Sequence, residues 1–413
     1  MEQTITRLWN RDFSLLVIGQ IISIFGNMIL SFALPLYILD ISGSAALYGL
    51  VMGLPYISLL IVSPIGGIMA DRLRKQRIMF WLDAFTTIII VLFLISRGFI
   101  GSAVPIVIIK LLALNAIQGM YIPAVQSSVP MLVSSDKLMS GNSAVGGVNL
   151  LSSMIGMAVA GILYARFGLL PILIGSAICF AITAVIDLFI RIPYKKQDDT
   201  GSIAQIIKSD LSETIRFAIK EKPILAKGAL ILFLLNLFLT SLLMVGLPVL
   251  ITQHLELGME LVGVNQSIMM LGGLFGTITA GALGTRLTII KAFFYMAISC
   301  VFIIPTGIIF LVDTPIMLSY IIITATGTIS FFAIQLFSIA GITFIQGETR
   351  TELIGKVMSV LLMLPFLANA LGMVLYGTLF EQFETMPWVV IFATAILSGA
   401  IAMFAQNYLK KSM

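Results

Sequence analysis

The sequence predicts an all-α integral membrane protein with twelve transmembrane helices arranged in two six-helix bundles. The first observation is composition: of the 413 residues, 59% are hydrophobic and only 10% are charged, with a mean hydropathy of +1.09. A soluble domain carries about 25% charged residues, so this chain could not cover a water-facing surface. The second is a series of twelve apolar runs, each near the ~20 residues that cross a bilayer. The third is a short basic loop that occurs once in each half of the chain, as expected for two related halves.

The twelve expected spans follow one another with mostly short connections. They are Phe13–Leu39, Ala46–Ala70, Ile78–Ser96, Val104–Val125, Leu138–Tyr164, Leu169–Ile190, Ile224–Ile251, Leu261–Gly284, Ala292–Val312, Ile316–Ile342, Leu353–Phe380 and Trp388–Ala405. The first run lacks the small-residue cleavage site of a secretory signal, so we expect it to remain as a span.

The distribution of Lys and Arg predicts the orientation of the chain. With the N-terminus inside, all but three of the 24 Lys and Arg residues fall in cytoplasmic segments or at their edges. The exceptions are Arg97, Lys110 and Arg166. Because cytoplasmic loops carry the excess of positive charge, we expect both chain ends in the cytoplasm.

One long polar segment, Arg191–Lys227, lies between the sixth and seventh spans. It divides the chain into an N-terminal bundle (1–191), a cytoplasmic linker (192–223) and a C-terminal bundle (224–413). Two interpretations of the linker remain open. It forms an amphipathic helix on the inner leaflet, with Ile203, Ile206, Ile207, Leu211 and Ala218 on one face and Glu213, Arg216 and Lys220 on the other, or it is a solvated connection.

A tight basic loop between the second and third spans is the most informative segment. Five of the seven residues from Asp71 to Arg77 are charged, whereas the runs on either side are nearly free of charge. Two apolar helices joined by such a loop form a hairpin whose tip lies at a membrane face rich in anionic lipid. A fainter copy stands in the second half of the chain and comprises Gly281, Thr285, Arg286 and Leu287.

This loop resembles the signature between helices two and three of the major facilitator superfamily. The residues that match are Gly67, Asp71, Arg72, Lys75 and Arg77. The span count, the central linker and the second copy agree, so the resemblance covers the whole chain and implies a multi-pass protein of the bacterial plasma membrane. The chain most resembles the branch that contains macrolide-efflux proteins and the enterobactin exporter, through Gln118-Gly119, Pro123-Ala124, Pro130 and Asn142-Ser143.

The resemblance implies a gating role for the loop. In relatives the carboxylate at the position of Asp71 faces the N-terminus of helix eleven, where unpaired N–H groups and the helix dipole favour an anion. Arg72, Lys75 and Arg77 would surround this latch. The alternative is that the loop only enforces topology. Two departures from the family pattern are Arg74, where a glycine is common, and Thr285, which stands in the second copy where the first has Asp71.

The fourth span departs from the export relatives, which often carry an arginine in an Arg-x-x-Gln-Gly pattern that is linked to proton coupling. Here Asn115 occupies the arginine position, ahead of Gln118. Lys110 lies about 140° around the helix from Asn115, so it is no simple substitute. It either lines a cavity as a cation or snorkels to the outer interface.

Two further acidic residues lie within spans, Asp83 in the third and Asp187 in the sixth. Each could serve as a proton or charge relay. The alternative is structural pairing, of Asp83 with the basic loop and of Asp187 with Arg191 four residues later. The C-terminal spans hold no acidic or basic residue well inside the bilayer, so any ion-coupling group should lie in the N-terminal half.

Family architecture places helices one, four, seven and ten around a central cavity, and their polar residues are the candidate substrate contacts. Helix one offers a stripe within about 80° that comprises Gln20, Ser23, Asn27 and Ser31. The others are Lys110, Asn115 and Gln118 on helix four, Asn236 and Thr240 on helix seven, and Gln335 and Ser338 on helix ten. The alternative for each is hydrogen bonding between helices. Amides and hydroxyls without acidic clusters suit a neutral or amphipathic organic solute.

The sequence therefore favours a secondary transporter that exports drugs or similar amphipathic solutes by alternating access, with proton antiport as a candidate driving reaction. A lipid or lysolipid flippase, or an importer of the same fold, is the alternative. We expect no enzymatic activity, cofactor or metal site, because no phosphate-binding loop, metal-ligand cluster or Ser/His pair stands out. Expected partners are a small organic substrate, membrane lipid and possible coupling protons, with no nucleic acid, and the expected state is a monomer.

Overall fold

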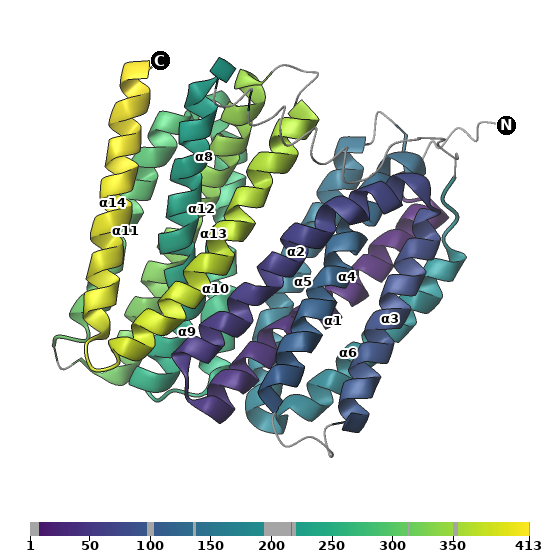
Figure 1. Cartoon of the computed structure of the whole chain (residues 1–413), viewed down its shortest axis with the longest axis horizontal. Coiled ribbons are helices and arrows are strands. Elements are labelled where there is room, and N and C mark those ends of the chain that lie inside the picture. Colours follow the sequence, from purple (N-terminus) through teal and green to yellow (C-terminus); the bar gives the residue numbers. More distant parts are fainter. Residues whose placement is uncertain are drawn as a thin grey trace. The chain divides into compact units, whose positions relative to one another are not determined.

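The computed structural model describes residues 8–96, 103–134, 138–193, 216, 220–312, 314–349 and 354–412, and these form almost entirely helices (Figure 1). The first half contains α1 (Arg11–Ser42), α2 (Ala45–Arg72), α3 (Lys75–Ser96), α4 (Ala103–Leu132), α5 (Leu138–Phe167) and α6 (Leu169–Phe189). The second half contains α8 (Pro223–Leu235), α10 (Met259–Leu283), α11 (Ile289–Ile308), α12 (Ile316–Glu348), α13 (Ile354–Gln382) and α14 (Pro387–Ser412).

The helix that begins with α8 continues through three π-helical segments. These are η3 (Asn236–Thr240), η4 (Leu242–Gly246) and η5 (Leu250–His254), with the short α9 (Leu247–Val249) between the last two. A 3-10 turn, η6 (Gly284–Arg286), follows α10.

Within the described part of the chain, 12 helices are long and apolar enough to cross a membrane, which confirms the predicted all-α membrane fold and its span count. Several ends differ from the prediction. The helix α3 begins at Lys75, so Lys75 and Arg77 belong to its first turn, and the loop after α2 is shorter than expected. The helix α4 runs on past Pro123 and Pro130, because a membrane helix tolerates proline where neighbours satisfy the freed carbonyls. Most of the predicted linker helix lies outside the described residues.

A single residue, Gly168, separates α5 from α6. Its φ of 69° lies in the left-handed region, which a side chain disfavours. Its backbone N–H donates to the Tyr164 carbonyl at 2.8 Å, which closes the C-terminal end of α5. Glycine at this position therefore allows two long helices to follow one another with almost no loop.

By contact the chain divides into two compact units. The first comprises Met1–Ile38 and Leu54–Ile203, and the second comprises Leu39–Gly53 and Ala204–Met413. In the first unit α3 packs against α6 and α4, and in the second α10, α11, α12 and α14 form closely packed pairs. Small residues permit this proximity: a Cβ on Gly272 of α10 would stand 2.4 Å from the Thr328 carbonyl of α12.

The segment Leu39–Gly53, which joins α1 to α2, belongs to the second unit because it packs on α13. The carboxylate of Glu381 accepts hydrogen bonds from the Ser44 hydroxyl and from the Ala46 backbone N–H, the latter at 2.9 Å, and so caps the N-terminus of α2. One turn further on, a Cβ on Gly49 would stand 2.3 Å from the Met373 carbonyl. Backbones in such close contact leave no room for a side chain.

Candidate functional site

Two buried carboxyl groups lie near one another inside the first unit. Asp83 comes from α3 and Asp187 from α6, two helices that pack against each other, and each side chain is only 1% exposed. The two carboxyls interact electrostatically with one another. The Oδ2 atom of each has no hydrogen-bond partner among the described residues. An unsatisfied carboxyl oxygen in an apolar interior is costly, so this pair calls for an explanation.

The polar surroundings of the pair come from α1 and α4. The Ser23 hydroxyl hydrogen-bonds the Asp83 carboxyl, and Oδ1 of Asp187 lies 4.0 Å from the point where Gly19 would carry a Cβ. The phenol of Tyr121 is within electrostatic range of both carboxyls, and it accepts a hydrogen bond from Gln20 Nε2 at 3.1 Å. Four helices thus converge on one polar cluster, which we call the carboxyl cluster and define as Gln20, Ser23, Asp83, Tyr121 and Asp187.

The structural pairings considered for these two acidic residues are not seen among the described residues. The helix α6 ends at Phe189, so Arg191 does not follow Asp187 on the same helical face, and its backbone N–H instead donates to Asp12 Oδ1 at 3.0 Å. Arg77 stands six residues before Asp83 on α3, about 240° around the helix, and is exposed. Among the described residues neither acidic side chain forms an ion pair.

A cavity of about 230 Å³ lies within the second unit. It is formed by α8, η3, α11, α12 and α13, and four of the predicted substrate contacts line it: Asn236, Thr240, Gln335 and Ser338. None of the described residues that line it is acidic or basic. The rest of the wall is apolar and includes Met296, Phe331, Phe337, Ile342 and Pro365.

The polar groups of this cavity are held in place by local hydrogen bonds. Asn236 Nδ2 donates to the Leu232 carbonyl at 2.9 Å, which leaves Oδ1 to accept from the Thr240 hydroxyl at 3.4 Å. Gln335 Nε2 reaches the Thr277 hydroxyl of α10 at 3.5 Å. The cavity therefore presents a fixed set of amide and hydroxyl groups among aromatic and aliphatic side chains, as small-molecule sites do.

The π-helical segment η3 carries both Asn236 and Thr240. The hydroxyl of Ser241 bonds back to the Asn236 carbonyl at 3.3 Å, and it lies against α13, where a Cβ on Gly372 would meet its Oγ at 2.2 Å. The wider π turn rotates the following residues relative to a regular helix, and such turns occur frequently at functional sites.

The remaining predicted contacts on α1 and α4 divide into two groups. Gln20 and Ser23 are buried in the carboxyl cluster, so only the later half of the α1 stripe, Asn27 and Ser31, is partly exposed. On α4, Asn115 and Gln118 are also partly exposed, and Asn115 Nδ2 donates to the Leu111 carbonyl at 2.9 Å.

Lys110 is buried within the first unit. Its side chain is 3% exposed, its Nζ lies 3.9 Å from the centroid of the Phe93 ring, and this nitrogen has no hydrogen-bond partner among the described residues. The ammonium therefore does not snorkel, and an aromatic face takes the place of a carboxylate.

The gating motif is described only in part, because the surroundings of Gly67 and the side chains of Asp71 and Arg72 lie outside the described residues. Its two copies differ in backbone. In the first, α2 remains helical to Arg72, whereas in the second α10 ends at Leu283 and the 3-10 turn η6 follows. Gly284, with a φ of 49°, begins that turn.

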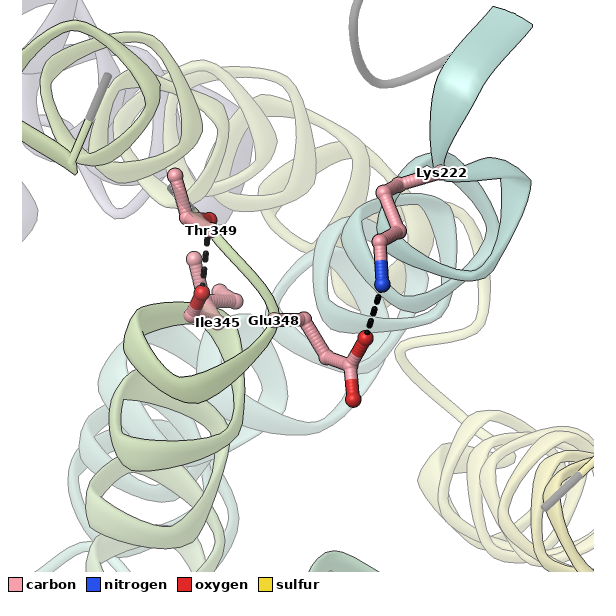
Figure 2. A network of polar contacts seen from close by, with 4 residues as sticks. All are labelled: Lys222, Ile345, Glu348 and Thr349. Atoms are coloured by element: carbon pink, nitrogen blue, oxygen red, sulfur yellow. Dashed lines mark hydrogen bonds and ion pairs between the residues drawn. The ribbon is translucent and has the colours of Figure 1, made fainter. Parts of the chain in front are cut away.

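One end of the cavity-lining helices is joined by an ion pair. Lys222, immediately before α8, lies 2.8 Å from Oε2 of Glu348, the last residue of α12 (Figure 2). Next to it, the Thr349 hydroxyl donates to the Ile345 carbonyl at 2.6 Å and closes the last turn of α12 (Figure 2). This pair connects the two helices that supply all four polar lining residues.

Tyr121 and the proximity of Asp83 to Asp187 were not predicted from the sequence. Tyr121 follows Gln118 by three residues and so shares its helical face, a signal that was available. The meeting of the two acidic residues depends on how α3 packs against α6, and that contact between distant segments leaves no local pattern.

Comparisons with known proteins agree along the whole chain. A family model described as the Major Facilitator Superfamily matches residues 16–373. Macrolide efflux protein A from Streptococcus pyogenes is 21% identical over 409 residues, which covers 98% of each chain.

Solved structures share the fold at low identity. The nucleoside transporter NupG matches with a TM-score of 0.76 and 15% identity over 97% of this chain and 100% of that chain. A D-xylose-proton symporter matches with a TM-score of 0.72 and 11% identity over 94% and 96%. A bacterial homologue of the human lysosomal transporter Spinster, in an inward-facing and unoccupied conformation, matches with a TM-score of 0.70 and 12% identity over 97% of each chain.

Proposed function

Because the chain belongs to the major facilitator superfamily, as its resemblance predicted, we propose that it is a secondary active transporter that exports amphipathic organic solutes by alternating access. The family match and the twelve apolar helices make it a multi-pass membrane transporter of small molecules. In such folds two related helical bundles rock about a central solute site. The substrate class and the direction of transport are the proposed part.

The cavity of the second unit is the observation that carries this proposal. Amide and hydroxyl groups on η3 and α12 stand among Phe331, Phe337 and Met296, with no ionisable group among the described lining residues. A charged solute would lack a counter-charge here and would lose its hydration without compensation. A solute with a hydrophobic body and a few neutral polar groups could contact both the apolar side chains and the amide and hydroxyl groups of the lining.

Export is supported by the relative that matches over its full length, which is named for macrolide efflux. The structural neighbours include transporters of nucleosides and of xylose, and they support the fold alone. We therefore derive the proposed direction from the efflux relative and the proposed solute chemistry from the cavity.

The remaining features of the proposal concern the membrane. The many exposed isoleucine, leucine and phenylalanine side chains would contact lipid. The distribution of Lys and Arg supports an orientation with both ends in the cytoplasm of a bacterial plasma membrane. The protein would act as a monomer, with Gly67, Asp71, Arg72, Lys75 and Arg77 as the motif that gates it.

The test is a solute screen with the purified protein in proteoliposomes under an imposed pH gradient. We expect neutral and weakly basic amphipathic compounds, macrolides among them, to move when the gradient is present. Substitution of Asn236 and Ser338 by leucine together should abolish that movement while the protein remains monodisperse. Movement of fluorescent lipid between leaflets without drug flux would instead make the protein a flippase, and flux of sugars or nucleosides alone would reject the amphipathic substrate class.

A further inference from the structure

We infer that the second unit binds the headgroup of an anionic phospholipid where α8 packs on α14, and that Lys227 is the cation that holds it. The site comprises Lys227 and Leu230 on α8 with Phe404 and Tyr408 on α14, and we call it the lysine–tyrosine site. This inference goes beyond the proposed transport function, because none of these four residues lines the solute cavity.

The position of the Lys227 ammonium is fixed by one tyrosine. Its Nζ lies 4.3 Å from the centroid of the Tyr408 ring and donates a hydrogen bond to the Tyr408 hydroxyl. These contacts hold the ammonium between α8 and α14 while the side chain of Lys227 stays exposed. An ammonium has three N–H donors, and this one forms no ion pair with a described residue. Donors therefore remain for an anion from outside the chain.

An exposed apolar surface adjoins this ammonium. Leu230, about one turn further along α8, is 58% exposed, and Phe404, about one turn before Tyr408 on α14, is 71% exposed. The rings of Phe404 and Tyr408 stack with their planes 19° apart. At 1.5 Å per residue, Leu230 lies about 4.5 Å further into the span than Lys227. A cation followed by apolar side chains matches the order of a charged headgroup and its acyl chains.

Further positive charge surrounds the end of α14. Gln406 Nε2 lies 3.5 Å from the Ile290 carbonyl, which joins this end to the beginning of α11. There Arg286 and Lys291 are both exposed, and Lys291 Nζ donates to the Arg286 carbonyl at 2.9 Å. The sequence adds Lys410-Lys411 to the last turn of α14. This end of the second unit therefore attracts anions.

Charge and position together select an anionic phospholipid as the occupant. The described acidic residues at this end are Glu221 and Glu348, and Glu348 pairs with Lys222 at 2.8 Å. The cytoplasmic leaflet carries anionic headgroups, and basic pockets between membrane helices on that side bind them. A free phosphate would gain nothing from the exposed apolar side chains, whereas a phospholipid would place its phosphate on Lys227 and its chains on those side chains. This step rests on the proposed orientation with both chain ends in the cytoplasm.

The test titrates the detergent-purified, full-length protein with phosphatidylglycerol and records the retained lipid by native mass spectrometry. Lys227→Met keeps the length of the side chain and removes its charge. The matched control is Arg11→Met, which removes one exposed charge from α1 in the first unit. Loss of a charge-assisted hydrogen bond should weaken binding of the tightest phosphatidylglycerol by about tenfold in Lys227→Met. Lys227→Arg and the control should bind it as the wild type does.

Melting temperature gives a second measurement. Phosphatidylglycerol should raise the melting temperature of the wild type and the control more than that of Lys227→Met, because a ligand stabilises the state that binds it. Equal binding and equal stabilisation in Lys227→Met, or a response to phosphatidylcholine as large as that to phosphatidylglycerol, would overturn the proposed site. Inorganic phosphate that displaces the lipid and stabilises the protein equally would overturn the lipid as its occupant. Neither measurement uses a transported solute, so a failure of the transport proposal leaves this result unchanged.

Discussion

The interiors of the two units differ in charge. The first unit buries the ionisable side chains of Lys75, Asp83, Lys110 and Asp187. Three of them, Asp83, Lys110 and Asp187, each have a buried polar atom without a hydrogen-bond partner among the described residues. The second unit encloses an open cavity whose described lining carries amides, hydroxyls and aromatic rings but no ionisable group. The described part of the first unit therefore holds buried ionisable groups, whereas that of the second holds an uncharged pocket.

The difference suggests a division of tasks. Buried ionisable groups are costly, so they persist where their charge changes during function. An uncharged pocket with fixed polar groups suits a solute that must bind and leave without a counter-ion. The cavity of the second unit is accordingly where the proposed solute recognition is tested below.

The largest effect is expected when a charge is placed in the uncharged cavity of the second unit. Gln335→Glu changes one atom of a lining side chain and keeps its shape, while its contact with Thr277 remains possible. A carboxylate without a partner costs at least about 2 kcal/mol, so affinity for a neutral solute should fall by more than about 30-fold. Calorimetric titration of the detergent-purified protein measures this.

The matched control for that change is Gln335→Met, which removes the polar group without adding charge and should cost less. A cationic amphipath should bind Gln335→Glu better than the wild type, because the carboxylate provides a counter-charge. Equal affinity of all three proteins for neutral and cationic solutes would show that this cavity does not recognise the transported molecule.

The packing of the segment Leu39–Gly53 on α13, within the second unit, gives the second prediction. Gly49→Leu would force a side chain into the Met373 carbonyl of α13, whereas Gly175, exposed on α6 with nothing within 4 Å of its Cβ position, can accept leucine freely. Both changes improve helix propensity equally, so their difference isolates the clash. We expect Gly49→Leu to lower the free energy of unfolding by about 1–3 kcal/mol relative to Gly175→Leu.

Thermal unfolding in detergent measures this difference, and the reactivity of a cysteine placed at Ser44 reports whether the segment Leu39–Gly53 has left α13. Increased labelling is expected for Gly49→Leu only. If stability and labelling match those of Gly175→Leu, the contact between α2 and α13 is loose, and Leu39–Gly53 should be regarded as part of the first unit.

Much of the fold could be predicted because a membrane leaves few options. Every backbone polar group must be satisfied within a span, so apolar length alone located the helices to within a few residues, except at the C-terminal ends of α4, α12 and α14. Those three continue past the point where polarity rises, because polar helix ends can extend beyond the hydrocarbon core. The π-helical turns of η3 to η5 carry no sequence signal of this kind, and they were not predicted.

Four residues that line the cavity of the second unit were singled out from the sequence, whereas the carboxyl cluster was not. Asn236, Thr240, Gln335 and Ser338 were proposed from family architecture, and all four line the cavity of the second unit. The partners of Asp83 were sought along its own helix, although Asp187 lies far away in sequence. Local periodicity identifies which residues share a face, but only packing decides which faces meet.

Two lysines that lie over aromatic rings allow the stability effect of a buried ammonium to be compared with that of an exposed one. Lys110 in the first unit is buried over the Phe93 ring, and its Nζ has no hydrogen-bond partner among the described residues. Lys227 in the second unit is exposed. Its Nζ lies 4.3 Å from the centroid of the Tyr408 ring and donates a hydrogen bond to the Tyr408 hydroxyl. Methionine keeps the length of either side chain. We expect Lys110→Met to raise the free energy of unfolding by about 1 kcal/mol, because desolvation of the ammonium exceeds the attraction of one ring.

Lys227→Met is the control for that change and should leave stability equal to the wild type or slightly lower, because this ammonium keeps its water. Melting temperatures of both variants in the same detergent test the prediction. A fall in stability for Lys110→Met would mean that the ammonium has a stronger partner than Phe93, and its assignment as an unpaired buried charge would be wrong.

The smallest effect is expected at the exposed end of the cavity helices, where Lys222 meets Glu348 with side chains that are 43% and 34% exposed. Water screens such a pair, so a double-mutant cycle with Lys222→Gln and Glu348→Gln should give a coupling of roughly 0.2–1 kcal/mol. Melting temperatures of the two single variants and the double variant give that coupling energy. Solute flux should change by less than about twofold, because the pair joins α8 to α12 without touching the cavity. A loss of flux far larger than the loss of stability would contradict this prediction. It would require the pair to become buried in another conformation of the second unit, so that buried charge would contribute to transport in both halves of the protein.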